Sequence, residues 1–313
     1  MTAASRSLTV HPVPGEGAED VVVARDGTVL TGTADGSIWR LRPDGSRIDL
    51  VARTGGRPLG LELFDDGDLL VCDARRGLLL VGPGGGIEEL VTEVDGQPMR
   101  FCNNAAIAAD GTVWFSDSSR LYGVDRWKDD FVQDTRTGRL LRRDVDGTVT
   151  VALDGLAFAN GVALSRGEEF VAVAETGGRT VVRLWLTGDR AGRRDLLCDD
   201  LPGYPDNISR GSDGLIWVTL ASPRDPLVES LKRAPMALRK AVTRIPERLQ
   251  PKPQRTIRVR AYDDDGRLVH DLDVDHPGYH MVTGVREHGG QVWMGSLHEP
   301  AVAVLDLSSW SGT

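Results

Sequence analysis

The chain has 313 residues, including 37 glycines and 16 prolines, so these turn-forming residues make up about 17% of it against a usual ~12%. Its 40% hydrophobic and 27% charged residues indicate a globular protein, and the glycine content argues against a helical bundle. The formal net charge of −9 disfavours general nucleic-acid binding, and no run of about 18 apolar residues could form a transmembrane helix.

The N-terminal segment and the cysteines bear on the compartment. The sequence MTAASRSLTVHPVPGEG contains no continuous apolar stretch of the kind found in secretory signals. The three cysteines, Cys72, Cys102 and Cys198, are odd in number and form no CxxC pair, which argues against a disulfide framework and against a zinc site. We therefore expect a cytoplasmic protein.

One unit recurs along the chain, an apolar strand, a tight turn and a second apolar strand, followed by a further turn and strand. Asp-Gly turns such as Asp26-Gly27 and Asp110-Gly111 lie between alternating apolar runs, which is a strong hairpin signal. The copies cover residues 21–41, 59–81, 105–124, 162–186, 208–223 and 285–307. Six such units predict an all-β fold, a six-bladed β-propeller forming a single domain over 1–313. A β-sandwich or two stacked β domains is the alternative.

Two segments lengthen this repeat, and we expect both to cover the channel mouth. Residues 118–137, in the third unit, carry Tyr122, Trp127 and Phe131 among charged residues. Residues 222–256, in the fifth unit, combine a net charge of +6 with apolar residues at helical spacing, which predicts a short, basic, amphipathic helical insertion. A lid or pocket wall is the favoured interpretation. A packed helix with a solvated basic face comes second, and contact with a membrane surface is the least favoured.

Side chains that carry oxygen recur where four of the inner strands begin. Glu19, Asn103 and Asp206 each lie eight residues before the turn glycine of their unit, and Asn160 lies seven before its own. The other two units have apolar residues at this place, Leu59 and Val282. Inner strands of a propeller start around a central channel, so two carboxylates and two carboxamides should converge there. Left unpaired, they would carry a large cost in desolvation and repulsion.

This donor set predicts a site for a hard cation. Ca²⁺ takes about six to eight oxygen ligands, including Asp, Glu and Asn, whereas zinc prefers Cys and His. The expected cofactor is therefore Ca²⁺, with another divalent cation as a less favoured choice. Asn104 and Asn207 directly follow two of these positions and are candidates for substrate binding or further ligation. As strand neighbours of those residues, they are expected to face the other way.

Several segments together resemble a known superfamily. They are GTADGSIWRL, GRPLGL, FCNNAAIAADGTVWFSDSS, FANGVALS, VAVAET and LPGYPDNI. They are similar to the strictosidine-synthase-like and SMP-30/gluconolactonase/paraoxonase superfamily of calcium-binding six-bladed propellers, and most similar to the adipocyte plasma membrane-associated type and its bacterial relatives. The resemblance implies that Glu19, Asn103, Asn160 and Asp206 are the metal ligands. It also implies hydrolysis of lactones and aryl esters.

One position departs from the pattern of that superfamily. Plant strictosidine synthases carry a catalytic Glu in the last blade, and Thr283 stands where that Glu is expected in HMVTGVREHGG. This departure puts amine–aldehyde condensation in doubt. A calcium-dependent hydrolase is therefore the favoured function. A biosynthetic lyase, cyclase or synthase on the same scaffold, and a non-catalytic binding module, are the alternatives.

The candidate catalytic residues are Asp206, which could act as both ligand and base, and His280, because histidine titrates near neutral pH. Thr283 and Trp127 join Asn104 and Asn207 as candidate substrate-binding residues. The expected partner is a small-molecule substrate. The sequence specifies neither the identity of that substrate nor the oligomeric state.

Overall fold

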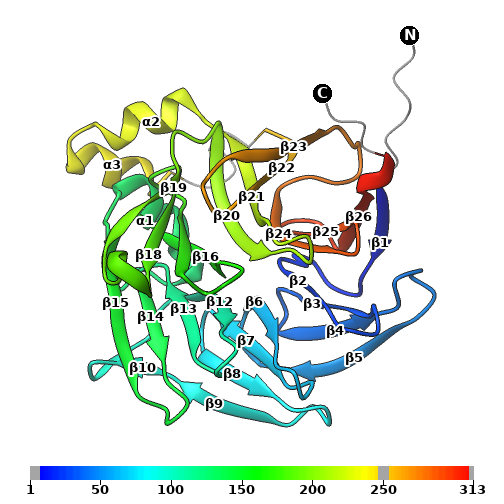
Figure 1. Ribbon diagram of the computed structural model, residues 1–313. Coiled ribbons are helices and arrows are strands. Elements are labelled where there is room, and N and C mark those ends of the chain that lie inside the picture. The colour runs from blue at the N-terminus through cyan, green and yellow to red at the C-terminus, as the bar shows by residue number, and fades with distance from the viewer. Residues whose placement is uncertain (1–7, 246–253, 310–313) are drawn as a thin grey trace.

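A computed structural model of the chain describes residues 8–245 and 254–309. Residues 246–253 of the predicted insertion, and both ends of the predicted domain, lie outside the described residues. The described part forms six four-stranded antiparallel sheets arranged around a central axis (Figure 1), which confirms the predicted six-bladed β-propeller. No helix in this part is long and apolar enough to cross a bilayer.

Each blade is built mainly from four consecutive strands. Blade 1 contains β2 (Val21–Val23), β3 (Val29–Gly32), β4 (Ser37–Leu41) and β5 (Ile48–Arg53). Blade 2 contains β6 (Pro58–Leu63), β7 (Leu69–Asp73), β8 (Gly77–Val81) and β9 (Ile87–Val91). Blade 3 contains β12 (Cys102–Ile107), β13 (Val113–Asp117), β14 (Gly138–Arg143) and β15 (Val149–Leu156), and follows a small hairpin of β10 (Glu93–Val94) and β11 (Gln97–Pro98).

The second half repeats the arrangement with one exception. Blade 4 contains β16 (Ala159–Leu164), β17 (Phe170–Glu175), β18 (Thr180–Trp185) and β19 (Arg194–Cys198). Blade 5 contains β20 (Gly203–Arg210), β21 (Ile216–Pro223), β22 (Ile257–Tyr262) and β23 (Leu268–Val274). Blade 6 contains β24 (Val282–His288), β25 (Gln291–Ser296) and β26 (Ala301–Asp306), and takes its fourth strand, β1 (Thr9–Pro12), from the N-terminal end of the chain. This exchange closes the ring by pairing β1 with β26.

The inner strand of each blade is the first one after the crossover, so β2, β6, β12, β16, β20 and β24 surround the axis (Figure 1). The turn after β2 shows why the repeat forms. Gly27 has a φ of 83°, which glycine adopts at little cost, and the Asp26 side chain accepts a hydrogen bond from the Thr28 amide. Described apolar side chains fill one cluster between each pair of neighbouring blades, and a seventh cluster is formed by Leu59, Ala74, Phe101 and Phe158.

Five inner strands carry a bulge at the place where they meet the axis. In β12, Cys102 pairs with Asp117 and Ala105 with Phe115, so Asn103 and Asn104 together face a single residue of β13. The same register shift occurs in β6, β16, β20 and β24. Because a bulge turns its side chains out of the regular alternation, two successive residues can approach the channel.

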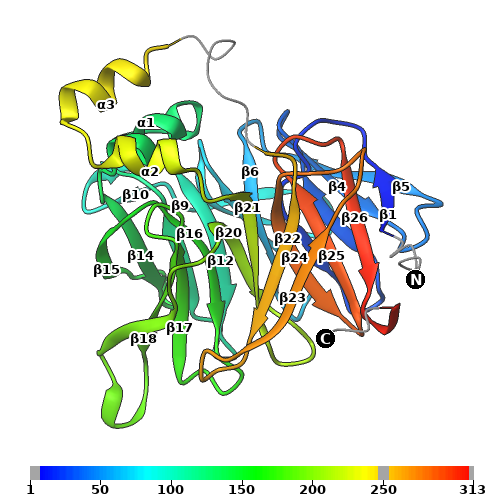
Figure 2. The same cartoon turned by 90° about the horizontal axis from the view of Figure 1, so that it is seen from above.

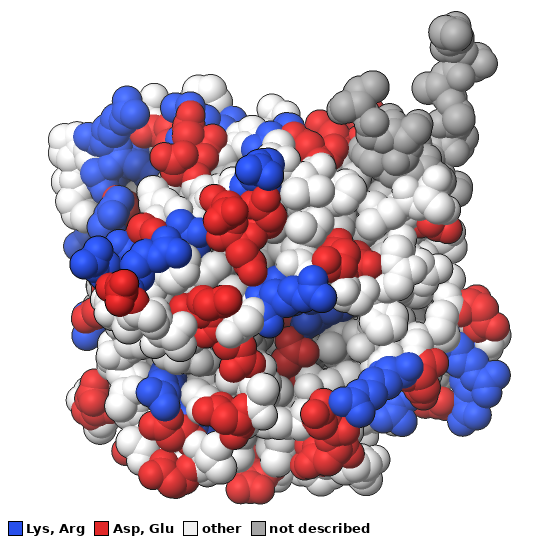
Figure 3. Space-filling model, viewed as in Figure 1, with Lys and Arg blue, Asp and Glu red and all other residues white. Residues whose placement is uncertain are grey.

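The helices lie on one face of the propeller (Figure 2). In blade 3 the link from β13 to β14 contains η1 (Val124–Arg126) and α1 (Trp127–Gln133), and in blade 5 the link from β21 to β22 contains α2 (Pro226–Lys232) and α3 (Met236–Val242). The predicted helical insertion in the fifth blade is therefore confirmed. Short 3-10 turns, η2 (Gly188–Arg190) and η4 (Leu307–Ser309), lie elsewhere. Lys and Arg side chains gather over α2 and α3, at the upper left of Figure 3.

Candidate functional site

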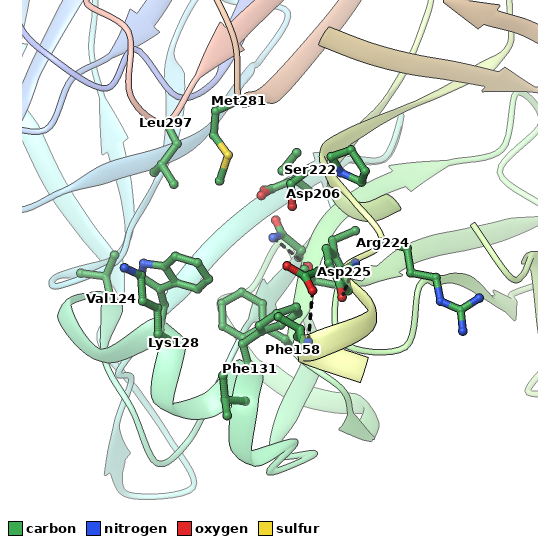
Figure 4. Close-up of a pocket in the computed structure, with 18 of the residues that line it drawn as sticks. Val124, Lys128, Phe131, Phe158, Asp206, Ser222, Arg224, Asp225, Met281 and Leu297 are labelled. Carbon is green, nitrogen blue, oxygen red and sulfur yellow. Dashed lines mark hydrogen bonds between the residues drawn. The ribbon is translucent and has the colours of Figure 1, made fainter. Parts of the chain in front are cut away.

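The four predicted ligands meet at one cavity on the helical side of the channel. Glu19, Asn103, Asn160 and Asp206 all line this cavity, which has a volume of about 260 Å³. Leu59, the apolar residue predicted at the same place in blade 2, lines it too. In Figure 4, Asp206 lies at the centre, with Met281 and Leu297 on one side and Phe131 and Phe158 on the other. One position of the repeat thus produces one cluster in space.

The structure explains the irregular spacing of Asn160 and corrects the assignment in blade 6. In the turn of blade 4, the left-handed residue is Glu168, with a φ of 56°, and it lies eight residues after Asn160, as in the other blades. In blade 6, Val282 pairs with Ser296 just as Cys102 pairs with Asp117. The equivalent of Asn103 is therefore Thr283 and not Val282. The prediction was wrong by one residue because the Gly289-Gly290 turn is shorter.

Both carboxamides are held with their oxygens free. Asn103 donates from Nδ2 to Ser118 Oγ at 2.8 Å, and Asn160 donates from Nδ2 to Thr176 Oγ1 at 3.2 Å. The Oδ1 atoms of both residues are buried and have no hydrogen-bond partner in the protein. An unpartnered buried acceptor costs about 1–3 kcal/mol, so these two oxygens at one cavity are suited to an electropositive ligand.

The two carboxylates differ in their surroundings. Glu19 Oε2 accepts a hydrogen bond from Arg57 Nη2 at 2.8 Å, and burial raises the pKa of Glu19 although Arg57 acts in the opposite direction. Burial also raises the pKa of Asp206 well above its usual range, and the nearby negative charge of Glu19 adds to this. Two acidic groups that are both costly to ionise are stabilised by a cation between them.

A second polar layer lies one residue further along each inner strand. Blades 1, 3 and 5 place Asp20, Asn104 and Asn207 in this layer, and blades 2, 4 and 6 place glycines there, Gly60, Gly161 and Gly284. Asn104 Nδ2 contacts Asp20 Oδ2 at 3.4 Å, and Asn104 Oδ1 accepts from the Val162 amide at 2.8 Å. Asn104 therefore reaches blades 1 and 4 from blade 3. The expectation that it faces away from the channel was wrong because the bulge redirects it.

The remaining predicted residues are placed as follows. Trp127, on α1, lines the cavity. Asn104 and Asn207 are buried beside it and do not line it, and neither side-chain amide atom of Asn207 has a partner. Thr283 is fully buried and donates to the Glu19 carbonyl at 2.9 Å. It therefore holds the backbone of a candidate metal ligand, Glu19, and does not face the cavity. His280 lies outside the lining, where its Nδ1 hydrogen-bonds Glu299.

An apolar collar above the donor ring was not predicted. Phe101, Phe158, Tyr204 and Met281 all line the cavity, and each lies two residues before the ring position of its blade. Phe101 and Phe158 pack edge to face, with ring centroids 5.4 Å apart. The signal was available, because large apolar residues recur at this offset. The exceptions are Gly17 in blade 1 and Arg57 in blade 2.

The helices complete the wall above this collar. Phe131 of α1 packs edge to face on Tyr204, with ring centroids 4.9 Å apart. Lys232 of α2 places its Nζ 4.2 Å from the Phe131 ring centroid and donates to the Gly177 carbonyl at 2.8 Å. Glu229 accepts from the Tyr204 hydroxyl at 3.0 Å. Both insertions thus contribute to the wall, and α2 is tied to the propeller by specific polar contacts.

The donor chemistry fits a hard divalent cation. No cluster of three or more His, Cys, Asp or Glu side chains suited to a metal occurs within residues 8–245 and 254–309, so the site depends on its carboxamides. Two carboxylates with two free carboxamide oxygens are the donor types that Ca²⁺ prefers. The fold and this ring define a class, namely six-bladed propellers with an oxygen-donor cluster on the axis.

Comparison with known proteins gives the family. Family models match residues 103–189 (strictosidine synthase) and 6–41 (strictosidine synthase-like, N-terminal). Protein STRICTOSIDINE SYNTHASE-LIKE 10 of Arabidopsis thaliana is 37% identical over 266 residues, covering 80% of this chain and 70% of that protein. Adipocyte plasma membrane-associated protein of Rattus norvegicus is 32% identical over 320 residues, covering 94% and 84% respectively. The chain therefore belongs to the strictosidine synthase-like family.

Solved structures agree on the fold. A gluconolactonase from Xanthomonas campestris matches with a TM-score of 0.70 at 17% identity, covering 96% of this chain and 89% of that one. The calcium-binding protein regucalcin from Agrobacterium tumefaciens matches with a TM-score of 0.65 at 15% identity, covering 94% of each chain. These similarities show that the chain shares the propeller fold of these two proteins.

Proposed function

We propose that this protein is a calcium-dependent hydrolase of hydrophobic lactones or aryl esters. The observation that carries the proposal is the pair of unpartnered carboxamide oxygens, Asn103 Oδ1 and Asn160 Oδ1, beside two carboxylates at an apolar cavity. Glu19, Asn103, Asn160 and Asp206 would hold the cation. When bound, Ca²⁺ would supply Lewis-acid polarisation of the substrate carbonyl.

The residues of the chain have separate roles in this proposal. Asp206 lines the cavity, and its carboxylate would accept the proton of the attacking water. His280 is the less favoured base, since it lies outside the cavity lining and is hydrogen-bonded to Glu299. Ser118 and Thr176 would fix the orientation of the two carboxamides.

The collar favours an apolar substrate. Phe101, Phe158, Tyr204 and Met281 surround the space directly above the ring, and Trp127 and Phe131 extend this surface. A polyhydroxylated lactone would leave hydroxyl groups unpaired against these side chains, at a cost of about 1–3 kcal/mol each. An acyl chain or an aromatic leaving group would instead replace water there.

A synthase remains the alternative function because the family model of strictosidine synthase matches residues 103–189. The sixth blade argues against condensation by the plant route. Thr283 is fully buried, and the acid that follows it in the same strand, Glu287, accepts hydrogen bonds from Ser212 Oγ and the Asp213 amide. No carboxylate of that strand is thus available at the cavity.

A hydrolysis panel tests the proposal. The chelator-treated protein is assayed with aryl acetates, with γ- and δ-lactones bearing alkyl chains, and with a sugar lactone, before and after Ca²⁺ is restored. We expect Ca²⁺-dependent hydrolysis of the apolar substrates, little turnover of the sugar lactone, and a loss of about 100-fold or more in Asp206→Asn. Asp189→Asn, on the exposed η2 turn, serves as the matched control. Hydrolysis that survives chelation would disprove the metal-dependent mechanism.

A further inference from the structure

Arg57 is the charged residue of the collar, at the position that large apolar residues occupy in blades 3 to 6. Its side chain turns toward blade 1, where the equivalent collar position is Gly17. Gly17 has a φ of 63°, and a Cβ there would lie 2.8 Å from the Leu297 carbonyl oxygen, 2.9 Å from Nη2 and 3.0 Å from Nη1 of Arg57, so the glycine leaves room for both groups. Arg57 and Glu19 form an ion pair of 2.8 Å, and both side chains are 8% exposed.

The backbone of Arg57 is fixed independently of this ion pair. Its amide donates to Asp73 Oδ1 at 2.9 Å, and its carbonyl accepts from the Ala74 amide at 2.9 Å. The guanidinium has few other partners, because Nη1 is buried without a hydrogen-bond acceptor in the protein. A buried guanidinium is costly unless a charge compensates it. The Arg57 guanidinium is therefore held against Glu19, whose carboxylate compensates its positive charge.

We propose that Arg57 is a built-in counter-charge of the candidate cation site, and that it lowers the affinity of this site for divalent cations. This inference rests on the proposed function, because it assumes that Glu19 and Asp206 bind a cation. The two carboxylates supply two negative charges, and Arg57 reduces the local sum to one. Even at the dielectric of water, a unit positive charge a few ångströms from a divalent cation weakens its binding by about tenfold.

The arrangement has a consequence for the bound ion. When the ligands carry less negative charge, the bound cation keeps a larger net positive charge. That charge would polarise a substrate carbonyl more strongly. Arg57 also keeps Glu19 paired when no cation is present, which limits the cost of burying that carboxylate. Arg57 is thus a positioning and charge-balancing residue that acts through Glu19.

Calcium titration by calorimetry of the chelator-stripped full chain tests the proposal. Arg57→Met removes the charge and keeps much of the volume, and we expect it to bind Ca²⁺ at least about tenfold more tightly than the wild type. Arg57→Lys should remain close to the wild type. Arg183→Met is the matched control, because Arg183 is buried and forms a 2.8 Å ion pair with Asp195 across β18 and β19, the outer strands of blade 4. It should lose stability without a change in Ca²⁺ affinity.

A second variant keeps the test informative if Arg57→Met does not fold. Arg57→Gln removes the charge and keeps a polar group beside Glu19, and it should also tighten Ca²⁺ binding by about tenfold. Equal or weaker Ca²⁺ binding in both variants, with normal binding by the wild type, would overturn the role of Arg57 and leave the proposed hydrolase standing. A wild type that binds no Ca²⁺ would overturn both.

Discussion

At the scale of single residues, orientation matters as much as identity. An asparagine side chain can point either its oxygen or its amide nitrogen toward the cavity, and only the oxygen can coordinate a cation. Ser118 and Thr176 each accept a hydrogen bond from the amide nitrogen of one ring asparagine. Both directly follow the second strand of their blades, β13 and β17, so the blade itself supplies the orientation.

Thr176→Val tests this orientation. The substitution keeps the shape of the side chain and removes the oxygen that holds Asn160 Nδ2. We expect Ca²⁺ affinity to fall by about tenfold, because partners that orient a ligand have effects of this size. Calorimetric titration measures it, with Thr150→Val, on the exposed face of β15, as the control. An unchanged affinity would mean that Asn160 is oriented without Thr176.

The sequence predicted much of this site at the residue scale. Counting back from the turn glycines brought together Glu19, Asn103, Asn160 and Asp206, which share the cavity. The count failed for blade 6, because its turn is two residues long. The direction of Asn104 also could not be read from the sequence, since strand alternation predicts the opposite face and only the bulge reverses it. The ion pair of Arg57 with Glu19 joins residues 38 positions apart, and no local pattern indicates it.

At the scale of elements, the inner strands alternate between bulky polar residues and glycine just below the ring. Gly60, Gly161 and Gly284 stand where the neighbouring odd-numbered blade brings in Asn104, Asn207 and Asp20. A Cβ on Gly161 would collide with the backbone of Asn207 and Ile208. Three blades therefore have glycine at this position, which allows the inner strands to approach closely around the axis.

Gly161→Ala should consequently destabilise the protein strongly. We expect a loss of about 3 kcal/mol in the free energy of unfolding, since backbone atoms cannot yield to the added methyl group. Gly84→Ala is the control, because nothing lies within 4 Å of a Cβ at that position. Denaturant unfolding compares the two. A loss below about 1 kcal/mol for Gly161→Ala would show that the inner strands are not packed as described.

The helical wall offers a second test at this scale. Lys232→Met removes the contact with the Phe131 ring and the hydrogen bond to the Gly177 carbonyl while keeping the apolar stem. We expect amide exchange in α2 to become about fivefold faster or more, because such contacts contribute about 0.5–2 kcal/mol. Lys240→Met, on the exposed side of α3, should leave exchange in α2 unchanged. Equal exchange in both variants would mean that Lys232 does not fasten the helix.

The helix in the fifth blade was predictable from its apolar spacing, whereas its anchoring was not. From the sequence, Lys232 is predicted to be one of many basic residues on the solvated face of the helical insertion. In the structure it is nearly buried between α1 and the propeller, with 9% of its side chain exposed. Tertiary contacts with Phe131 and Tyr204, which lie far away in sequence, decide this difference.

At the scale of the whole molecule, the ring is closed by pairing the two ends of the chain. β1 pairs with β26 from Thr9↔Val304 to Pro12↔Ala301, so blade 6 is completed by residues far away in sequence. The repeat count predicted six blades but not this exchange, because β1 precedes the first copy of the repeat. Closure matters because a propeller without it has an open interface between its first and last blades.

Removal of residues 1–12 should therefore lower the thermal midpoint markedly. We expect a decrease of about 10 °C or more, since the truncation exposes the edge of β26 and removes the packing of Val10 on the cluster between blades 5 and 6. Differential scanning calorimetry measures this shift. A decrease of less than about 2 °C would show that the three remaining strands of blade 6 close the ring without β1.

The central claim is that the four oxygen donors on the axis bind a divalent cation. Calorimetric titration of the chelator-stripped full chain with Ca²⁺, beside the double variant Asn103→Leu/Asn160→Leu, tests it most directly. We expect one Ca²⁺ per wild-type chain and an affinity at least about 100-fold lower in the double variant, which has lost the free carboxamide oxygens of Asn103 and Asn160. Equal Ca²⁺ binding by the two proteins, or no binding by the wild type, would contradict it.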